Sequence, residues 1–165
     1  MSKSRTSASP RLSPKVVGAV HRRDYLALEQ LVTDSTIDLS DDSGRTVLSL
    51  VSNYGDVVLL QWVLRKGPAL DRQDCNGWTA LHFAAQAYAV EMAALLLEAG
   101  AMVDVSDAYG NTALWRATFE SRGQGAMLHL LLAYGANPDQ RNNNGVSPRQ
   151  LAETIANFDV KQFFA

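Results

Sequence analysis

The chain has 165 residues, of which 47% are hydrophobic and 19% charged, a balance typical of a folded globular domain and not of a disordered polymer. Its net charge is −2, and because residues 1–15 contribute four basic and no acidic side chains, the rest of the chain sums to about −6. A body this acidic is a poor electrostatic match for a phosphate backbone, so we expect no binding to nucleic acid.

The first segment, residues 1–15, is rich in Ser, Arg, Lys and Pro and has almost nothing to bury, which predicts a disordered leader. Its acid-free, Arg- and Ser-rich composition also resembles an organelle transit peptide, although it shows no clear amphipathic helix. No apolar stretch near the start indicates a secretory signal. The longest periodic apolar run, residues 92–97, is far shorter than the roughly 20 residues of a membrane span. We therefore expect a soluble cytoplasmic protein.

Residues 16–40 come next and are typical of two short helices without an opening turn. Polar residues interrupt their apolar face, namely Arg22, Arg23, Glu29 and Gln30. A unit that is covered on one side only needs such a diluted face, so this segment is predicted to be an N-terminal cap.

Residues 41–165 repeat one pattern four times. The repeats begin at Asp41, Asp74, Asp107 and Asn142, and their turn glycines are Gly44, Gly77, Gly110 and Gly145. These glycines are 33, 33 and 35 residues apart, and a second series, Gly67, Gly100 and Gly135, has spacings of 33 and 35. Because two independent markers agree on the period, we predict units at 41–73, 74–106, 107–141 and 142–165.

Within each unit the residue types predict a turn followed by two helices. Asp-x-x-Gly supplies the turn because glycine tolerates the left-handed conformation, and the Thr that follows can cap a helix with its hydroxyl. Small residues such as Ala80 and Ala84 predict a first helix that can approach its neighbours closely, and bulky residues such as Met92 and Leu96 predict a second helix. A glycine such as Gly100 ends that helix.

The cores of the repeats resemble the ankyrin family, whose signature is a period of about 33 residues with the core T-P-L-H-x-A. The matching stretches read TALHFA at 79–84, TALWRA at 112–117, TVLSLV at 46–51 and SPRQLA at 147–152. The resemblance covers almost the whole chain. It implies an all-α ankyrin-repeat solenoid over residues 16–165, with a capping helix pair and four stacked helix–turn–helix units that carry turn fingers. In the last repeat we expect residues 158–165 to form the second helix, with Phe163 and Phe164 closing the core.

No residue pattern predicts catalysis. His21, His82 and His129 lie in different units without a second ligand at metal-binding spacing, and the resemblance implies that His82 is a structural hydrogen-bonding residue. The single cysteine, Cys75, excludes an intrachain disulfide and has no histidine near it in the sequence to activate it. Glycine motifs of nucleotide-binding proteins and hydrolases are missing too. We therefore expect no enzyme activity, cofactor, metal or small-molecule substrate.

The resemblance implies that a partner protein is bound by the turn tips and the exposed faces of the first helices, along a concave groove. At those positions the sequence places aromatic and arginine side chains, the types that most often anchor protein interfaces. The candidate contacts are Arg45, Tyr54, Trp78, Tyr88, Tyr109, Asn111, Trp115 and Phe119. We expect Trp78 to be the anchor, because a turn gives it no structural role. Trp115 has the alternative of packing against the neighbouring turn.

The expected function is the binding of one protein partner by a monomer that acts as an inhibitor or escort. The alternatives are an immunity-type protein that neutralises a toxin enzyme, and an adaptor that links two proteins. Acidic residues outnumber arginines in the turn region, which favours a partner with a basic surface. The inserted loop ESRGQG at 120–125 is either a plain surface loop or an element on the groove side that reaches toward the partner.

Overall fold

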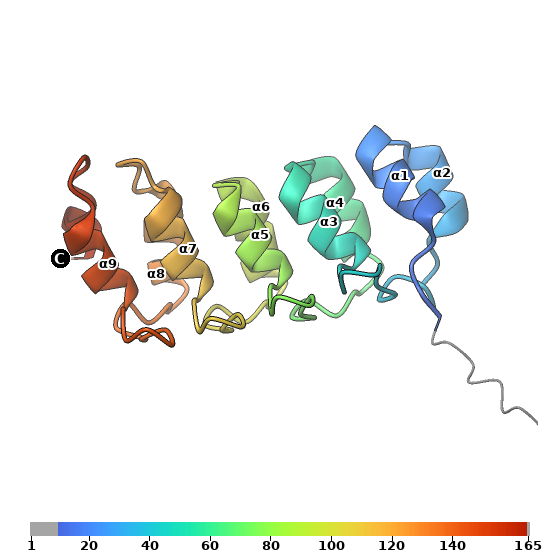
Figure 1. Ribbon diagram of the computed structural model, residues 1–165. Helices are drawn as coiled ribbons and strands as arrows, with labels where there is room; N and C mark the ends of the chain where they lie inside the picture. The colour runs from blue at the N-terminus through green and yellow to red at the C-terminus, as the bar shows by residue number, and fades with distance from the viewer. Residues whose placement is uncertain (1–9, 165) are drawn as a thin grey trace, which may run out of the picture.

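The computed structural model describes residues 10–164 and confirms the all-α ankyrin-type solenoid. The helix pairs stand side by side in one row (Figure 1). In chain order the helices are α1 (Pro14–Arg22), α2 (Tyr25–Leu31), α3 (Val47–Tyr54), α4 (Val57–Leu64), α5 (Ala80–Gln86), α6 (Val90–Glu98), α7 (Ala113–Glu120), α8 (Ala126–Ala133), α9 (Pro148–Thr154) and the 3-10 helix η1 (Val160–Phe164). Within the described residues the only β-type pairing is an isolated bridge between Ser40 and Thr46. None of the helices described is long and apolar enough to cross a membrane.

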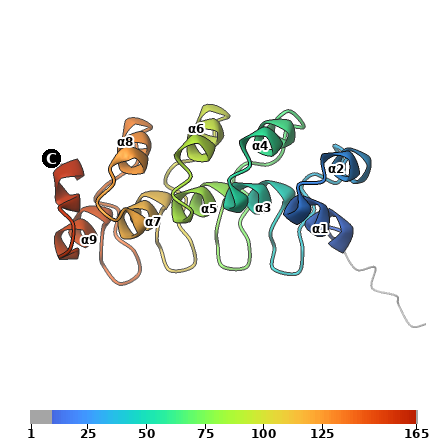
Figure 2. The same ribbon diagram turned by 90° about the horizontal axis from the view of Figure 1, so that it is seen from above.

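Seen from above, the helices form two layers (Figure 2). The first layer holds α1, α3, α5, α7 and α9, and the second holds α2, α4, α6 and α8. The turns of the repeats project from the first layer on the side away from the second layer. We call these turns the fingers, and they are residues 41–45, 74–78, 107–111 and 142–146.

The first helix of each repeat starts at a hydroxyl cap, as the sequence predicts. The side chains of Thr46, Thr79, Thr112 and Ser147 each accept a hydrogen bond from the backbone N–H three residues later. At Thr79 the contact is reciprocal, because the Thr79 backbone N–H donates to Nδ1 of His82 at 3.2 Å. Such a cap satisfies two N–H groups that a helix start leaves without an intrahelical partner.

Each finger is organised by one carboxylate or amide side chain. In the second finger, Oδ1 of Asp74 accepts hydrogen bonds from the backbone N–H groups of Asn76 at 2.8 Å and Trp78 at 2.9 Å. The same pair of bonds is made in the other fingers by Asp41, Asp107 and Asn142. Neighbouring fingers are joined through the backbone, where Ala108 N–H donates to the Asn76 carbonyl at 3.0 Å. Gly77 has φ of +77°, and a Cβ there would lie 2.6 Å from the Ala108 nitrogen, so only glycine fits.

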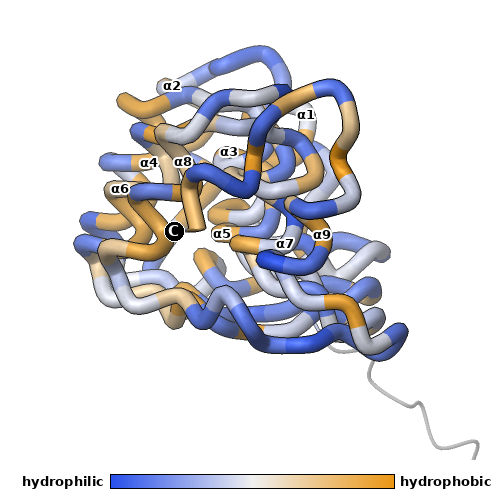
Figure 3. The backbone as a smooth tube through the Cα atoms, turned by 90° about the vertical axis from the view of Figure 1, so that its left-hand side faces the viewer, coloured by the Kyte–Doolittle hydropathy of each residue, from blue (hydrophilic) through white to orange (hydrophobic). Residues whose placement is uncertain are grey.

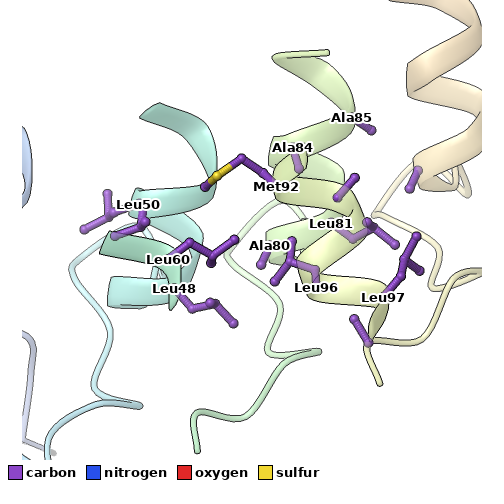
Figure 4. Close-up of a cluster of buried hydrophobic side chains, with 14 of the residues drawn as sticks. Leu48, Leu50, Leu60, Ala80, Leu81, Ala84, Ala85, Met92, Leu96 and Leu97 are labelled. Atoms are coloured by element: carbon purple, nitrogen blue, oxygen red, sulfur yellow. The ribbon is translucent and has the colours of Figure 1, made fainter. Parts of the chain in front are cut away.

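The core lies between the two layers and continues from repeat to repeat. In the close-up of Figure 4, the small side chains Ala80 and Ala84 of α5 lie beside the bulky Met92 and Leu96 of α6. All four are at most 1% exposed. Viewed along the row from the α9 end, hydrophobic segments gather mostly among the helices and hydrophilic segments dominate the loops (Figure 3). The division into small first helices and bulky second helices is therefore the one that the sequence predicts.

The folded part begins earlier than predicted. α1 starts at Pro14, and the side chain of Leu12 is only 5% exposed. The backbone N–H of Leu12 donates to the Ser40 carbonyl at 2.9 Å. Residues 10–15 are thus part of the fold because Leu12 has a core position to fill. The rest of the predicted leader, residues 1–9, lies outside the described residues.

At the other end, the predicted second helix of the last repeat is wrong. After α9 and a turn, the chain forms η1, a 3-10 helix of five residues, in place of the predicted α-helix. Phe164 is 6% exposed, and the ring of Phe163 meets the ring of His129 edge-on at 5.3 Å. The two phenylalanines therefore cover the end of the core without the helix. Ala165 lies outside the described residues.

Candidate protein-binding surface

The fingers and the first-layer helices together present one face of the molecule, on the side away from the second layer (Figure 2). We call it the finger surface. Six of the eight predicted contact residues lie in its fingers, namely in residues 41–45, 74–78 and 107–111, or on α7 behind them.

A chain of ring contacts connects the second finger to α7. The Trp78 ring makes two contacts. The ring of Phe83 lies 5.0 Å from it, and the guanidinium of Arg116 lies 4.3 Å from it. Arg116 also lies 6.0 Å from the ring of Trp115, which stacks on Phe119 at 5.8 Å with 8° between the ring planes. We call these five residues the aromatic–arginine cluster. It joins two neighbouring repeats through cation–π and ring–ring contacts.

Arg116 is fixed in this cluster by a buried carboxylate. Its Nη2 donates to Oδ2 of Asp107 at 2.6 Å, and the exposed fractions of the two side chains are 18% for Arg116 and 0% for Asp107. Oδ1 of Asp107 also accepts from the backbone N–H groups of Tyr109 at 2.8 Å and Asn111 at 2.9 Å. Burial raises the pKa of the Asp107 carboxyl, but Arg116 and the backbone donors outweigh burial and hold the pKa below its ordinary value of 3.8.

The cluster corrects the expectation that Trp78 has no structural role in its turn. Trp78 is half-buried and contacts both Phe83 and Arg116. Replacing it would therefore remove packing between repeats as well as any contact with a partner. A loss of binding in a Trp78 variant cannot be assigned to the interface alone, so a better probe must be more exposed.

Three of the predicted aromatic contacts are more exposed than Trp78. Tyr109, at the tip of the third finger, is 63% exposed, and Phe119, at the end of α7, is 60% exposed. Tyr54, at the end of α3, is 41% exposed and meets the ring of His21 edge-on at 5.0 Å. Large aromatic side chains with this exposure mark interaction surfaces when they gather on one face.

A family model of ankyrin repeats in three copies matches residues 17–107 and 50–142 of this sequence. The chain belongs to the ankyrin repeat family. Ankyrin repeats are a protein–protein interaction module, and the helices and fingers described above are their structural units.

The similarity extends to proteins of several organisms. A putative ankyrin repeat-containing protein of Treponema pallidum (strain Nichols) is 35% identical over 116 residues, which is 70% of this chain and 38% of the relative. The human SH3 and multiple ankyrin repeat domains protein 2 is 29% identical over 147 residues, 88% of this chain and 8% of the relative. The E3 ubiquitin-protein ligase hecd-1 of Caenorhabditis elegans is 27% identical over 113 residues, 67% of this chain and 4% of the relative. The chain thus spans 38% or less of the length of these relatives.

Within the ankyrin array, Asn111 is wrongly predicted as a contact residue. Its side chain is 5% exposed, and its Oδ1 accepts a hydrogen bond from Nδ2 of Asn142 at 2.8 Å. Its carbonyl oxygen lies 3.1 Å from Nε2 of His82, which donates to it because Nδ1 of that ring accepts from Thr79. Burial lowers the pKa of His82 below 6.5, which keeps the ring neutral. Asn111 and His82 therefore connect neighbouring ankyrin repeats. A structural hydrogen-bonding role was predicted for His82 but not for Asn111.

Two other predicted contacts are bound within the chain. Nη2 of Arg45 lies 2.9 Å from Oδ2 of Asp41 in the first finger, and the Arg45 side chain keeps 38% exposure. Tyr88 follows α5 at the end remote from the fingers, and its hydroxyl donates to the carbonyl of Gln124 in the inserted loop. Arg45 thus lies on the finger surface but is not a member of the cluster. Tyr88 lies away from both the fingers and the cluster.

The inserted loop does not lie at the fingers, which contradicts the groove-side expectation. It connects α7 to α8 at the opposite end of α7 (Figure 1). Gly123 and Gly125 face the rings of Phe158 and Phe163, and a Cβ on Gly123 would lie 2.9 Å from the Phe158 ring. The glycines of the insertion are therefore needed for contact with the C-terminal segment.

The acidic excess of the turn region is largely balanced within the chain. The acids that form ion pairs are Asp41, Asp42, Asp107 and Asp139, with Arg45, Arg11, Arg116 and Arg149 in that order. Asp71 and Asp104 accept backbone N–H bonds from the next ankyrin repeat, at Met102 and Asn137. No group of three or more potential metal ligands forms in the part of the chain that is described. The finger surface is accordingly aromatic in character more than acidic.

Sequence reasoning missed two members of the cluster, Phe83 and Arg116. Both occupy the residue after the histidine position of the T-A-L-H core, as in TALHFA and TALWRA. Aligning the repeats could have flagged this column because it faces the finger of the same or the preceding ankyrin repeat.

Proposed function

We propose that this ankyrin array binds one protein partner on the finger surface, as a stoichiometric inhibitor or escort that carries out no catalysis itself. The observation that carries the proposal is the aromatic–arginine cluster, whose outer member Phe119 is 60% exposed while its inner members are held in place. Rigid aromatic and arginine side chains lose little conformational freedom on binding, which is why they dominate interface energetics.

A local departure from the repeat pattern supports the proposal. His82 bonds to the backbone of the next repeat, and Trp115 occupies the same position one repeat later. Nε1 of Trp115 is buried and has no hydrogen-bond partner among the described residues. A buried donor without a partner costs about 1–3 kcal/mol, and sequences keep such costs mainly where function needs them.

Charge adds little to the choice of partner. Because most turn acids already have partners within the chain, the finger surface gives weak support to a basic partner. The hypothesis of an immunity-type inhibitor depends on that charge argument, so its support is weak as well. The proposed partner is instead one that covers aromatic side chains across the second and third fingers.

Site-specific photocrosslinking tests this assignment. The photoreactive residue p-benzoylphenylalanine replaces Tyr109 or Phe119, and for the control it replaces Glu98, an exposed residue of α6 in the second layer. In extract of the source cells we expect Tyr109 and Phe119 positions to give the same protein adduct and the Glu98 position to give none. Equal adducts at all three positions would contradict the proposal.

The captured protein then allows a quantitative check. Phe119→Ala should weaken its affinity by about tenfold or more, the loss expected of an interface anchor. The same change should lower the free energy of unfolding by less than about 1 kcal/mol, because Phe119 is mostly exposed. Affinity that survives in Phe119→Ala and Tyr109→Ala together would remove the finger surface as the site.

A further inference from the structure

A groove in the second layer lies on the opposite side of the molecule from the fingers. It has a volume of about 200 Å³ and is lined by Tyr25, Glu29, Val58, Leu59, Trp62 and Arg65. The first two residues belong to α2 and the next three to α4, which Arg65 follows directly. Further along the layer, α4 packs on α6 and α6 packs on α8. The groove between α2 and α4 is therefore a feature of the N-terminal end of this layer.

The α2 side of the groove is tied to α4 by one polar contact. The hydroxyl of Tyr25 donates to Oδ2 of Asp56 at 2.9 Å, and Oδ1 of Asp56 caps α4 by accepting from Leu59 N–H at 3.0 Å. Asp56 is 8% exposed, and Nε of Arg23 lies 3.6 Å from its Oδ2. The bond to Asp56 also raises the pKa of Tyr25. A groove held in this way is preformed, which lowers the cost of binding.

The inside of the groove is apolar. Leu59 is 1% exposed, whereas Val58 is 64% exposed and Tyr25 42% exposed. Trp62 is half-buried, and Nζ of Lys66 lies 4.7 Å from its ring. An apolar cavity of about 150 Å³ is large enough to bind benzene, so this groove has room for one phenylalanine or leucine side chain.

The two walls carry opposite charges that no described residue neutralises. Glu29 on α2 and Arg65 after α4 are both exposed, and neither takes part in any of the ion pairs formed within residues 10–164. An occupant that inserts an apolar side chain between the walls brings its own neighbouring residues next to these charges. Complementarity then requires a basic residue toward Glu29 and an acidic residue toward Arg65.

We propose that the α2–α4 groove docks an amphipathic helix of a second protein partner, through one large apolar side chain flanked by a basic and an acidic residue about one turn away. Residues one turn apart share a helix face, so a single helix can satisfy the apolar groove and both rim charges. Because α2 and α4, which line the groove, lie on the side away from the fingers (Figure 2), the ankyrin array can hold two partners at once. This goes beyond the proposed function and gives the adaptor interpretation the second surface that it needs.

The test uses the full chain with 5-fluorotryptophan at its three tryptophans, so that ¹⁹F NMR observes Trp62 separately from Trp78 and Trp115. The probes are three alanine-based helical peptides with a central phenylalanine, whose flanking residues are Lys and Glu, two Lys, or two Glu. We expect the mixed peptide to shift the Trp62 resonance saturably below about 1 mM while Trp78 and Trp115 stay unchanged. The two like-charged peptides should bind about two- to fivefold more weakly, the effect of one exposed ion pair.

Variants then separate the groove from general stickiness. Val58→Glu should weaken binding of the mixed peptide at least tenfold. Met102→Glu is a matched change at another exposed apolar residue and should leave the affinity for that peptide unchanged. Glu29→Lys should make the two-Glu peptide the best ligand. The Trp78 and Trp115 resonances report that each variant is folded, and Val58→Gln serves as the second variant of the groove.

The outcomes are distinct from those of the finger-surface experiment. The proposal fails if no peptide shifts Trp62 saturably, if the shift survives Val58→Glu, or if Glu29→Lys leaves the preference unchanged. A peptide that shifts Trp78 and Trp115 in place of Trp62 would also overturn the groove, while leaving the finger surface as a binding site.

Discussion

Replacing Arg116 with alanine tests whether one buried ion pair holds the aromatic–arginine cluster together. The Asp107 side chain is 0% exposed and 2.6 Å from Arg116 Nη2, so the variant leaves a buried carboxylate without its counter-ion. Removing one partner of a buried pair typically costs about 3–5 kcal/mol. Since Tyr109 and Asn111 still donate to Asp107, we expect the lower end, about 3 kcal/mol.

A matched change elsewhere sets the scale. Arg11 pairs with Asp42, and their side chains are 68% and 84% exposed. Arg11→Ala should therefore cost no more than about 0.5 kcal/mol. For a domain of this size, about 3 kcal/mol corresponds to a fall in melting temperature of roughly 6–12 °C. Urea and thermal unfolding followed by circular dichroism measure both variants.

Asp107→Asn completes a double-mutant cycle. Asn142 already organises the last finger with the same two backbone bonds, so an asparagine at 107 should keep the turn. In that background Arg116→Ala should cost only about 1 kcal/mol, which gives a coupling of about 2 kcal/mol between the two side chains. A coupling near zero would refute the view that the pair fixes the cluster.

The same pair has a definite pH dependence. Because the pKa of Asp107 is lowered in the folded state, its contribution to stability is complete above the ordinary value of 3.8 and is lost as pH falls through the folded pKa. Arg116→Ala removes a cause of that lowering. The stability difference between the wild type and Arg116→Ala should therefore shrink below pH 3.8. A difference that stays constant with pH would show that Arg116 acts through packing alone.

Three further predictions concern the joints between repeats. His82→Gln keeps a reciprocal cap of the kind that Gln150 forms in the last repeat. The variant should lose less stability than the wild type as pH falls below 6.5, because His82 takes up a proton more readily in the unfolded state than in the folded state, where burial lowers its pKa. Measuring the free energy of unfolding from pH 7.5 to 5 checks this. Gly77 and Gly67 both have a positive φ, but only at Gly77 would an added Cβ meet a neighbouring atom, at 2.6 Å. Urea unfolding should therefore show a loss of about 1 kcal/mol in Gly67→Ala and of at least about 3 kcal/mol in Gly77→Ala. Equal losses would count against the contact between fingers. Trp115→His should regain a hydrogen bond to the next repeat and lower the free energy of unfolding by less than about 1 kcal/mol. It should weaken partner binding at least tenfold. Unchanged binding would show that Trp115 only packs against the neighbouring residues.

Much of the scaffold could be predicted because it follows local rules repeated at a fixed period. The Thr79 cap, the Asp74 turn and the positive φ of Gly77 each depend on residues close in the sequence, so the residue types alone identify them. The same reasoning failed at the C-terminus. There Phe163 meets His129 of α8, a contact between repeats that the residue types of the segment do not reveal, and the segment forms η1 in place of an α-helix.

The candidate site was predicted less completely because its contacts join residues that are distant in the sequence. Trp78 meets Arg116, and Asn111 meets Asn142, each across the boundary between two repeats. Residue type placed Trp78 on the finger surface, but it could not show that the ring is half-buried. It also could not distinguish the buried Asn111 from the exposed Tyr109, two residues apart in one finger.

Trp115 stands at a position where this repeat departs from the pattern of the other three. In the other three repeats this column holds Ser49, His82 and Gln150, and each makes a hydrogen bond to the residue that caps its helix. Trp115 gives up a side-chain bond of this kind, leaves its own Nε1 without a partner among the described residues, and stacks on the exposed Phe119 instead. Packing alone does not require this exchange, since the neighbouring repeats pack without it. The residues that match the pattern therefore build the array, and the one that breaks it at a cost in stability marks where the partner is expected to bind.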